Sequence, residues 1–136
     1  MNAYVDSSVI LRVVFRQPKR LAAWSKLVRV WSSDLARVEC FRVLDRARLG
    51  ASVDDVAVAR IRGELDELFE SMNVVSIDRR ILRRAAEPMP TALRTLDAIH
   101  VASALAVRAR VSDLVIATHD DEMALAARAL AFRVLG

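Results

Sequence analysis

Four acidic side chains, those of Asp6, Glu39, Asp97 and Asp120, have the type and placement to do chemistry in this sequence. Carboxylates gathered in a pocket of low polarity repel one another unless a cation binds among them. Oxygen ligands of this kind favour Mg²⁺ or Mn²⁺, and such ions can activate water for phosphodiester hydrolysis. We therefore take the four acids as candidate metal ligands and catalytic residues.

Asp6 and Asp120 each follow a short apolar run that is typical of a buried strand. These runs are residues 3–5 and 114–118. Ligands of parallel sheets collect at the carboxyl ends of the strands, so both acids are expected at one edge. The alternative for each is a structural role, because aspartate is favoured in turns and at helix N-caps.

Glu39 and Asp97 are placed by helices. On a helical projection of residues 34–48, Glu39 falls within the apolar stripe, where a partly buried salt bridge to Arg46 is the alternative to a functional role. Asp97 enters the first turn of a helix whose next ten residues are uncharged. Its alternative role is a favourable interaction with the helix N-terminus.

The elements that must position these acids alternate between strand and helix. Strands are expected at 3–5, 73–77, 114–118 and 132–135, and helices at 21–31, 34–48, 55–71, 79–86, 96–110 and 121–130. Apolar strands joined by helices predict a parallel sheet covered on both faces. The expected fold is a three-layer α/β/α sandwich with a central, mainly parallel sheet, in one domain that covers residues 1–136.

The composition excludes several classes of protein. The chain has 136 residues, of which 54% are hydrophobic, and a single cysteine, which excludes an intramolecular disulfide and a cysteine-rich zinc site. Its longest uncharged stretch, residues 98–107, is too short to span a membrane, and the N-terminus lacks a signal-peptide pattern. We expect a soluble, cytoplasmic protein.

The charge distribution is consistent with a polyanionic partner. The net charge is +4, so the chain without its four candidate acids carries +8. An acidic pocket would then lie within a basic surface that can hold a nucleic acid. Arginine clusters at 60–62, 79–80 and 83–84 could contact phosphates, although solvated helix faces are the favoured explanation.

Four segments carry a resemblance to a known family. They are YVDSSVILR at 4–12, SSDLARVECFRVL at 32–44, LRTLDAIHVASAL at 93–105 and VIATHDDEMALAARALAFRVL at 115–135. Their order and spacing, over nearly the whole chain, resemble the PIN-domain ribonucleases and particularly the VapC toxins of bacterial toxin–antitoxin pairs. The resemblance places Asp6, Glu39, Asp97 and Asp120 on the family's acidic quartet, and Thr118 and Ser7 on its small hydroxyl positions. Asp121 is the alternative to Asp120.

The resemblance also implies an activity and partners. It implies a metal-dependent endoribonuclease that uses Mg²⁺ or Mn²⁺ and hydrolyses phosphodiester bonds of structured or single-stranded RNA, such as transfer or ribosomal RNA. It further implies a homodimer and a cognate antitoxin that inhibits the enzyme.

Other functions remain open on the residues alone. A catalytically silent module could use the same acidic pocket to bind RNA or a partner. A mixed site that adds His100 and His119 lacks a zinc signature. Receiver domains and aspartate-based phosphatases usually need a late lysine, and the last lysine here is Lys26.

Overall fold

A five-stranded parallel sheet forms the centre of the molecule. The computed structural model describes residues 1–136. Its strands are β1 (Asn2–Val5), β2 (Arg29–Ser33), β3 (Asn73–Val75), β4 (Val115–Ala117) and β5 (Val134–Leu135). They lie in the order β3-β2-β1-β4-β5, and every neighbouring pair is parallel. The carboxyl ends of all five strands therefore share one edge.

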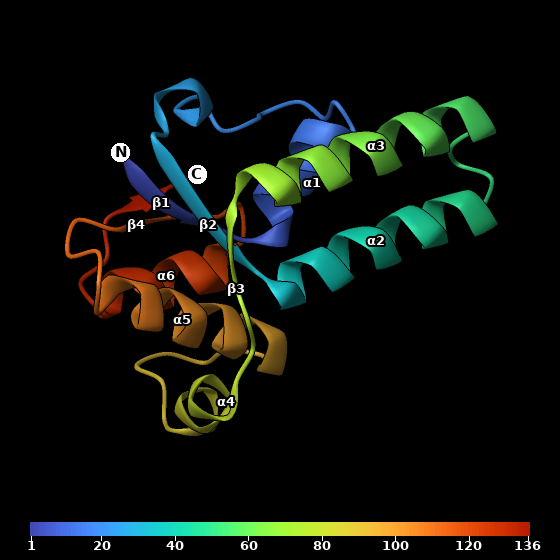
Figure 1. The fold of residues 1–136 in the computed structure, drawn as a ribbon. Helices are drawn as coiled ribbons and strands as arrows, with labels where there is room; N and C mark the ends of the chain where they lie inside the picture. The colour runs from blue at the N-terminus through green and yellow to red at the C-terminus, as the bar shows by residue number, and fades with distance from the viewer.

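Helices cover both faces of this sheet (Figure 1). The helices are α1 (Ser7–Val14), α2 (Asp34–Leu49), α3 (Asp55–Ser71), α4 (Arg79–Ala86), α5 (Thr95–Arg108) and α6 (Asp121–Ala129). In Figure 1, α1 and the long hairpin of α2 and α3 lie on one side, whereas α5 and α6 lie on the other, with α4 beyond α5. This arrangement confirms the predicted α/β/α sandwich. None of the helices is both long and apolar enough to cross a bilayer.

The two faces have separate cores because side chains alternate along a strand. Ala3 and Val5 of β1 pack into the cluster under α1, α2 and α3, whereas Tyr4 packs into the cluster under α5 and α6. In β4, Ala117 joins the first cluster and Ile116 the second. The apolar residues of β1 and β4 therefore point to both faces of the sheet.

The predicted helix over residues 21–31 is wrong. Only a 3₁₀ turn at Trp24–Lys26 is helical there, and β2 follows at once. Apolar residues in this segment do recur at helical spacing, but Val30 and Trp31 pair with β1, and Trp31 also pairs with β3. Pairing along both edges of β2 outweighs the weak local preference for helix.

Other helices lie close to their predicted ranges. The Ser33 side chain accepts a hydrogen bond from the Ala36 amide and begins α2, as expected for an N-cap residue. Helix α5 begins one residue before its predicted start, at Thr95, and Arg94 occupies the N-cap position without a side-chain hydrogen bond to the helix. A guanidinium has no acceptor for helix amides, so the side chain of Arg94 makes its contacts elsewhere.

Candidate active site

Asp6 lies at the end of β1 and caps α1. Its Oδ1 accepts hydrogen bonds from the Val9 amide at 3.2 Å and the Ser8 hydroxyl at 2.6 Å, and its Oδ2 accepts one from Thr118 Oγ1 at 2.7 Å. Only 4% of the residue is exposed, and no basic side chain forms an ion pair with it. Burial raises the pKa of Asp6 because neutral donors offset only part of the lost hydration.

Asp120 is joined to Asp6 through Thr118. Thr118 Oγ1, which donates to Asp6, also accepts a hydrogen bond from the Asp120 amide at 3.0 Å. The Oδ1 atom of Asp120 accepts from the Met123 amide at 2.8 Å and so caps α6. Neighbouring Asp121 is exposed and makes no side-chain contact with the other acids.

Asp97 lies in the first turn of α5 and shares a cation with Asp120. The Nε atom of Arg94 is 3.3 Å from Asp97 Oδ2, and its Nη2 atom is 3.4 Å from Asp120 Oδ2. Glu122 is a more distant third partner at 3.9 Å. Burial, and then the negative charge of Asp120, raises the pKa of Asp97.

Glu39 reaches the same region from the middle of α2. Its Oε2 atom is 2.6 Å from His100 Nε2, and His100 Nδ1 is 3.0 Å from the hydroxyl of Tyr4. His100 lies one helical turn after Asp97 on α5. The predicted alternative partner, Arg46, is instead exposed and forms no ion pair. Glu39 is therefore bound to a buried histidine, and its side chain remains 21% exposed.

The four predicted acids converge on the carboxyl edge of the sheet. Hydrogen bonds and ion pairs connect them in a chain: Asp6 to Asp120 through Thr118, Asp120 to Asp97 through Arg94, and the next turn of α5 to Glu39 through His100. No three His, Cys, Asp or Glu side chains are close enough together, as they stand, to form a metal site.

The donor set nevertheless fits a hard divalent cation. All four groups supply carboxylate oxygen, which Mg²⁺ and Mn²⁺ prefer. Asp6 is a buried acid without a counter-cation, and burying an unpaired charge is costly. The mixed histidine and carboxylate site is not favoured, because Tyr4 and Glu39 already engage both ring nitrogens of His100.

Sequence reasoning missed three residues of the site. Ser8, one residue after the hydroxyl position that the resemblance assigned to Ser7, is the serine that donates to Asp6. No motif in the sequence distinguishes Arg94 from the other arginines. Tyr4 had the pattern of an ordinary strand residue. The one signal in the sequence was that a tyrosine buried in an apolar run needs a hydrogen-bond partner for its hydroxyl.

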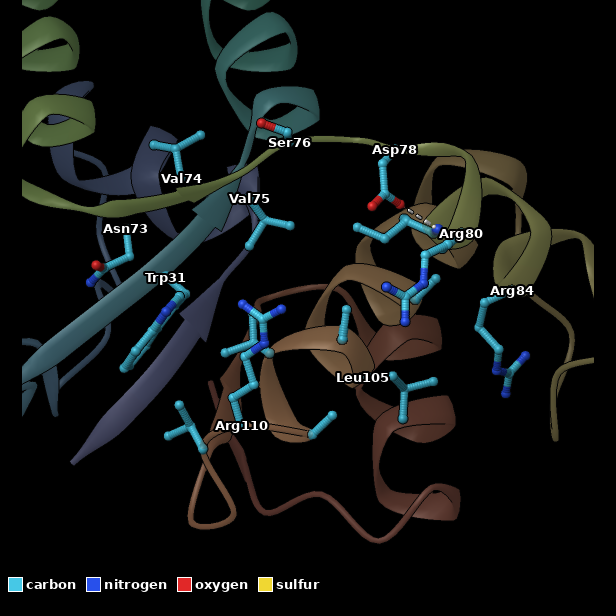
Figure 2. A pocket seen from close by; sticks show the side chains of 16 residues that line it. Trp31, Asn73, Val74, Val75, Ser76, Asp78, Arg80, Arg84, Leu105 and Arg110 are labelled. Atoms are coloured by element: carbon cyan, nitrogen blue, oxygen red, sulfur yellow. Dashed lines mark hydrogen bonds between the residues drawn. The ribbon is translucent and has the colours of Figure 1, made fainter.

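A cavity of about 730 Å³ lies apart from these acids (Figure 2). It is bounded by β3, α4 and the second half of α5, and the guanidinium groups of Arg80 and Arg110 point into it. The one carboxylate in its lining, Asp78, is used to cap α4 through the Ile81 amide. The cavity therefore lacks the acidic groups that the predicted chemistry requires.

Comparison with known proteins agrees with this fold. The profile of the PIN domain matches residues 3–129, and the chain therefore belongs to the PIN domain family. The chain is 34% identical to Ribonuclease VapC46 of Mycobacterium tuberculosis (strain ATCC 25618 / H37Rv) over 136 residues, which cover 97% of this chain and 95% of that protein. Within the family it is a VapC-type ribonuclease.

Solved structures of VapC proteins share the fold. VapC20 of M. tuberculosis, described as a sarcin–ricin loop cleaving toxin, superposes with a TM-score of 0.66 at 16% identity, covering 92% of this chain and 95% of that one. VapBC2 of Rickettsia felis, solved on a DNA fragment from its promoter, gives 0.64 at 10% identity, covering 98% and 97%. At such identities the likeness concerns the fold alone.

Proposed function

We propose that this protein is a metal-dependent endoribonuclease in which Asp6, Glu39, Asp97 and Asp120 hold Mg²⁺ or Mn²⁺. The observation that carries the proposal is the buried carboxylate of Asp6, which has no cationic partner and is linked through Thr118 to Asp120. A divalent ion would supply the missing positive charge. In the alternative, a catalytically silent module, a basic side chain of a partner would have to supply that charge.

The chain's own residues would prepare the site for hydrolysis. Ser8 and Thr118 hold one oxygen each of the Asp6 carboxylate. A bound divalent ion would activate water and stabilise negative charge on the leaving oxygen. No covalent intermediate is required. By the resemblance to VapC toxins, the products should carry a 5′-phosphate and a 3′-hydroxyl.

We propose that the substrate is RNA and that the enzyme acts in the cytoplasm. The +8 charge outside the quartet favours a polyanion. Single-stranded parts of transfer or ribosomal RNA are supported by the resemblance to VapC toxins and by the description of VapC20 as a sarcin–ricin loop cleaving toxin.

A cognate antitoxin and a homodimer complete the proposal. The support for an antitoxin is the similarity to the VapBC2 complex and to FitAB bound to a DNA fragment. Arg94 supports it independently, since a guanidinium is compatible with Asp97 and Asp120 at the same time. Light scattering should show a dimer at micromolar concentration, and a monomer alone would contradict the dimer.

Cleavage of RNA by purified protein tests the proposed activity. We expect cutting of total RNA with Mg²⁺ or Mn²⁺, no cutting in EDTA, and product ends with a 5′-phosphate. Cyclic 2′,3′-phosphate ends would contradict the metal–water route. Folded protein that leaves a broad RNA panel intact with either ion would favour the silent binding module.

A further inference from the structure

A buried relay of three side chains joins the elements that carry three of the four acids. Tyr4 lies on β1 two residues before Asp6, and His100 lies on α5 three residues after Asp97. Tyr4 is 0% exposed and His100 is 2% exposed. Their rings meet edge to face with centroids 6.1 Å apart. The third member is Glu39 itself, on α2.

The contact between His100 and Glu39 crosses the molecule. Helices α2 and α5 cover opposite faces of the sheet (Figure 1), so their side chains can meet only beyond the ends of the strands. The His100 Nε2 to Glu39 Oε2 distance of 2.6 Å makes this a short hydrogen bond. It fixes one carboxylate oxygen, whereas Oε1 of Glu39 accepts no hydrogen bond within the chain.

One partner also defines where a proton lies. A carboxylate can only accept, so the proton between His100 and Glu39 must be on Nε2. The hydroxyl of Tyr4 lies 3.0 Å from Nδ1, the other ring nitrogen. The hydrogen bonds therefore connect Tyr4 through His100 to Glu39.

We propose that His100 is a positioning residue that holds Glu39 by Oε2 and leaves Oε1 for a divalent cation, with Tyr4 fixing the histidine ring. This inference rests on the proposed function, because it assigns a purpose to the orientation of Glu39. A glutamate with three rotatable bonds and an exposed fraction of 21% would otherwise lose entropy on binding an ion. Partners that orient metal ligands commonly change affinity by about 10- to 100-fold.

Binding of Mn²⁺, measured by calorimetry on the full chain, tests the role of His100. We expect His100→Leu to weaken Mn²⁺ binding by about 10- to 100-fold. His100→Gln should recover part of that loss, because the glutamine Nε2 can still donate to Glu39. Tyr4→Phe should lose less than His100→Leu, since it removes only the support of the ring.

A control variant separates positioning from stability. Val107 is a buried residue of α5 in the same apolar cluster as Tyr4, without a polar contact to the acids. Val107→Ala should lower the melting temperature while Mn²⁺ affinity stays at the level of the unaltered protein. Equal loss of affinity in Val107→Ala and His100→Leu would overturn the positioning role.

Long-range ¹H–¹⁵N spectra of His100 provide a readout that needs no metal. We expect a protonated Nε2, and Tyr4→Phe should shift the resonance of Nδ1. An unprotonated Nε2 would overturn the relay. Unchanged Mn²⁺ binding in His100→Leu would overturn the inference alone, whereas failure of the unaltered protein to bind Mn²⁺ would overturn the proposed function and, with it, this role of His100.

Discussion

At the scale of single residues, the central feature is a carboxylate buried with neutral partners. Asp6 receives hydrogen bonds from Ser8, Val9 and Thr118, and burial still raises its pKa. The native state without metal therefore binds a proton at this site more tightly than the unfolded chain does. Its free energy of unfolding falls as pH rises from the ordinary value of 3.8 through the raised pKa.

Replacing Asp6 with asparagine should separate activity from stability. Asparagine keeps the N-cap acceptor for α1 but removes the buried charge. We expect Asp6→Asn to lose most RNA cleavage and Mn²⁺ affinity, while its melting temperature at neutral pH without metal equals or exceeds that of the unaltered protein. Full cleavage activity in the folded variant would contradict the assignment of Asp6.

The choice of Asp120 as the fourth acid gives a second prediction. Asp120 faces Arg94 and Asp97, whereas Asp121 is exposed on the first turn of α6. We expect Asp120→Asn to lower cleavage far more than Asp121→Asn, with kcat/KM measured on one RNA. Asparagine preserves the cap at position 120, so unfolding should not explain the loss. The opposite ranking would assign the role to Asp121.

In the proposed site, Arg94 would compete with a divalent cation for the same oxygens. Its guanidinium contacts Asp97 and Asp120, and 74% of its side chain is exposed, so the pairs are screened and weak. We expect Arg94→Gln to bind Mn²⁺ more tightly in calorimetry. The matched control is Arg128→Gln, which changes net charge equally at the other end of α6. Unchanged or weaker binding in Arg94→Gln would argue against competition.

At the scale of elements, most of the site's framework was predictable. Polar residues such as Ser33, Asp54 and Asp78 indicate where helices begin, because their side chains accept hydrogen bonds from backbone amides of the first turn. The strand β2 was not predictable in the same way, because its pattern of Trp31 and preceding apolar residues also suits a helix. Its state is decided by two neighbouring strands that are remote in sequence.

Within the site, the sequence predicted only the positions that follow from the direction of the strands. Asp6 and Asp120 follow their strands directly, so a parallel sheet brings them to one edge. The partners of Glu39 could not be inferred, because the contact with His100 depends on how α2 and α5 extend past the sheet. Arg94 is likewise placed by the start of α5, one residue earlier than its predicted beginning.

The hairpin of α2 and α3 supports Glu39 mainly by apolar packing. Leu65 of α3 is fully buried, within one cluster with Cys40 and Leu44 of α2. Leu65→Ala should lower the free energy of unfolding by about 2–5 kcal/mol, measured by urea denaturation. Mn²⁺ affinity of the folded fraction should change little. A loss well below 1 kcal/mol would show that this packing contributes little.

At the scale of the whole molecule, the four candidate acids carry a charge opposite to the net charge of the rest of the chain. Four acids lie at one edge of the sheet, and the rest of the chain carries +8. A basic exterior favours approach of a polyanion, but near the acids the same polyanion would be repelled without a cation. A divalent ion bound among the acids would therefore link the architecture to the proposed hydrolysis of RNA.

Anomalous diffraction from crystals soaked in Mn²⁺ tests this central claim most directly. We predict one or two manganese peaks within ligand distance of Asp6 and other members of the quartet, and their loss in crystals of Asp6→Asn. Fully loaded crystals without a peak among Asp6, Glu39, Asp97 and Asp120, or with manganese bound only elsewhere, would contradict the account.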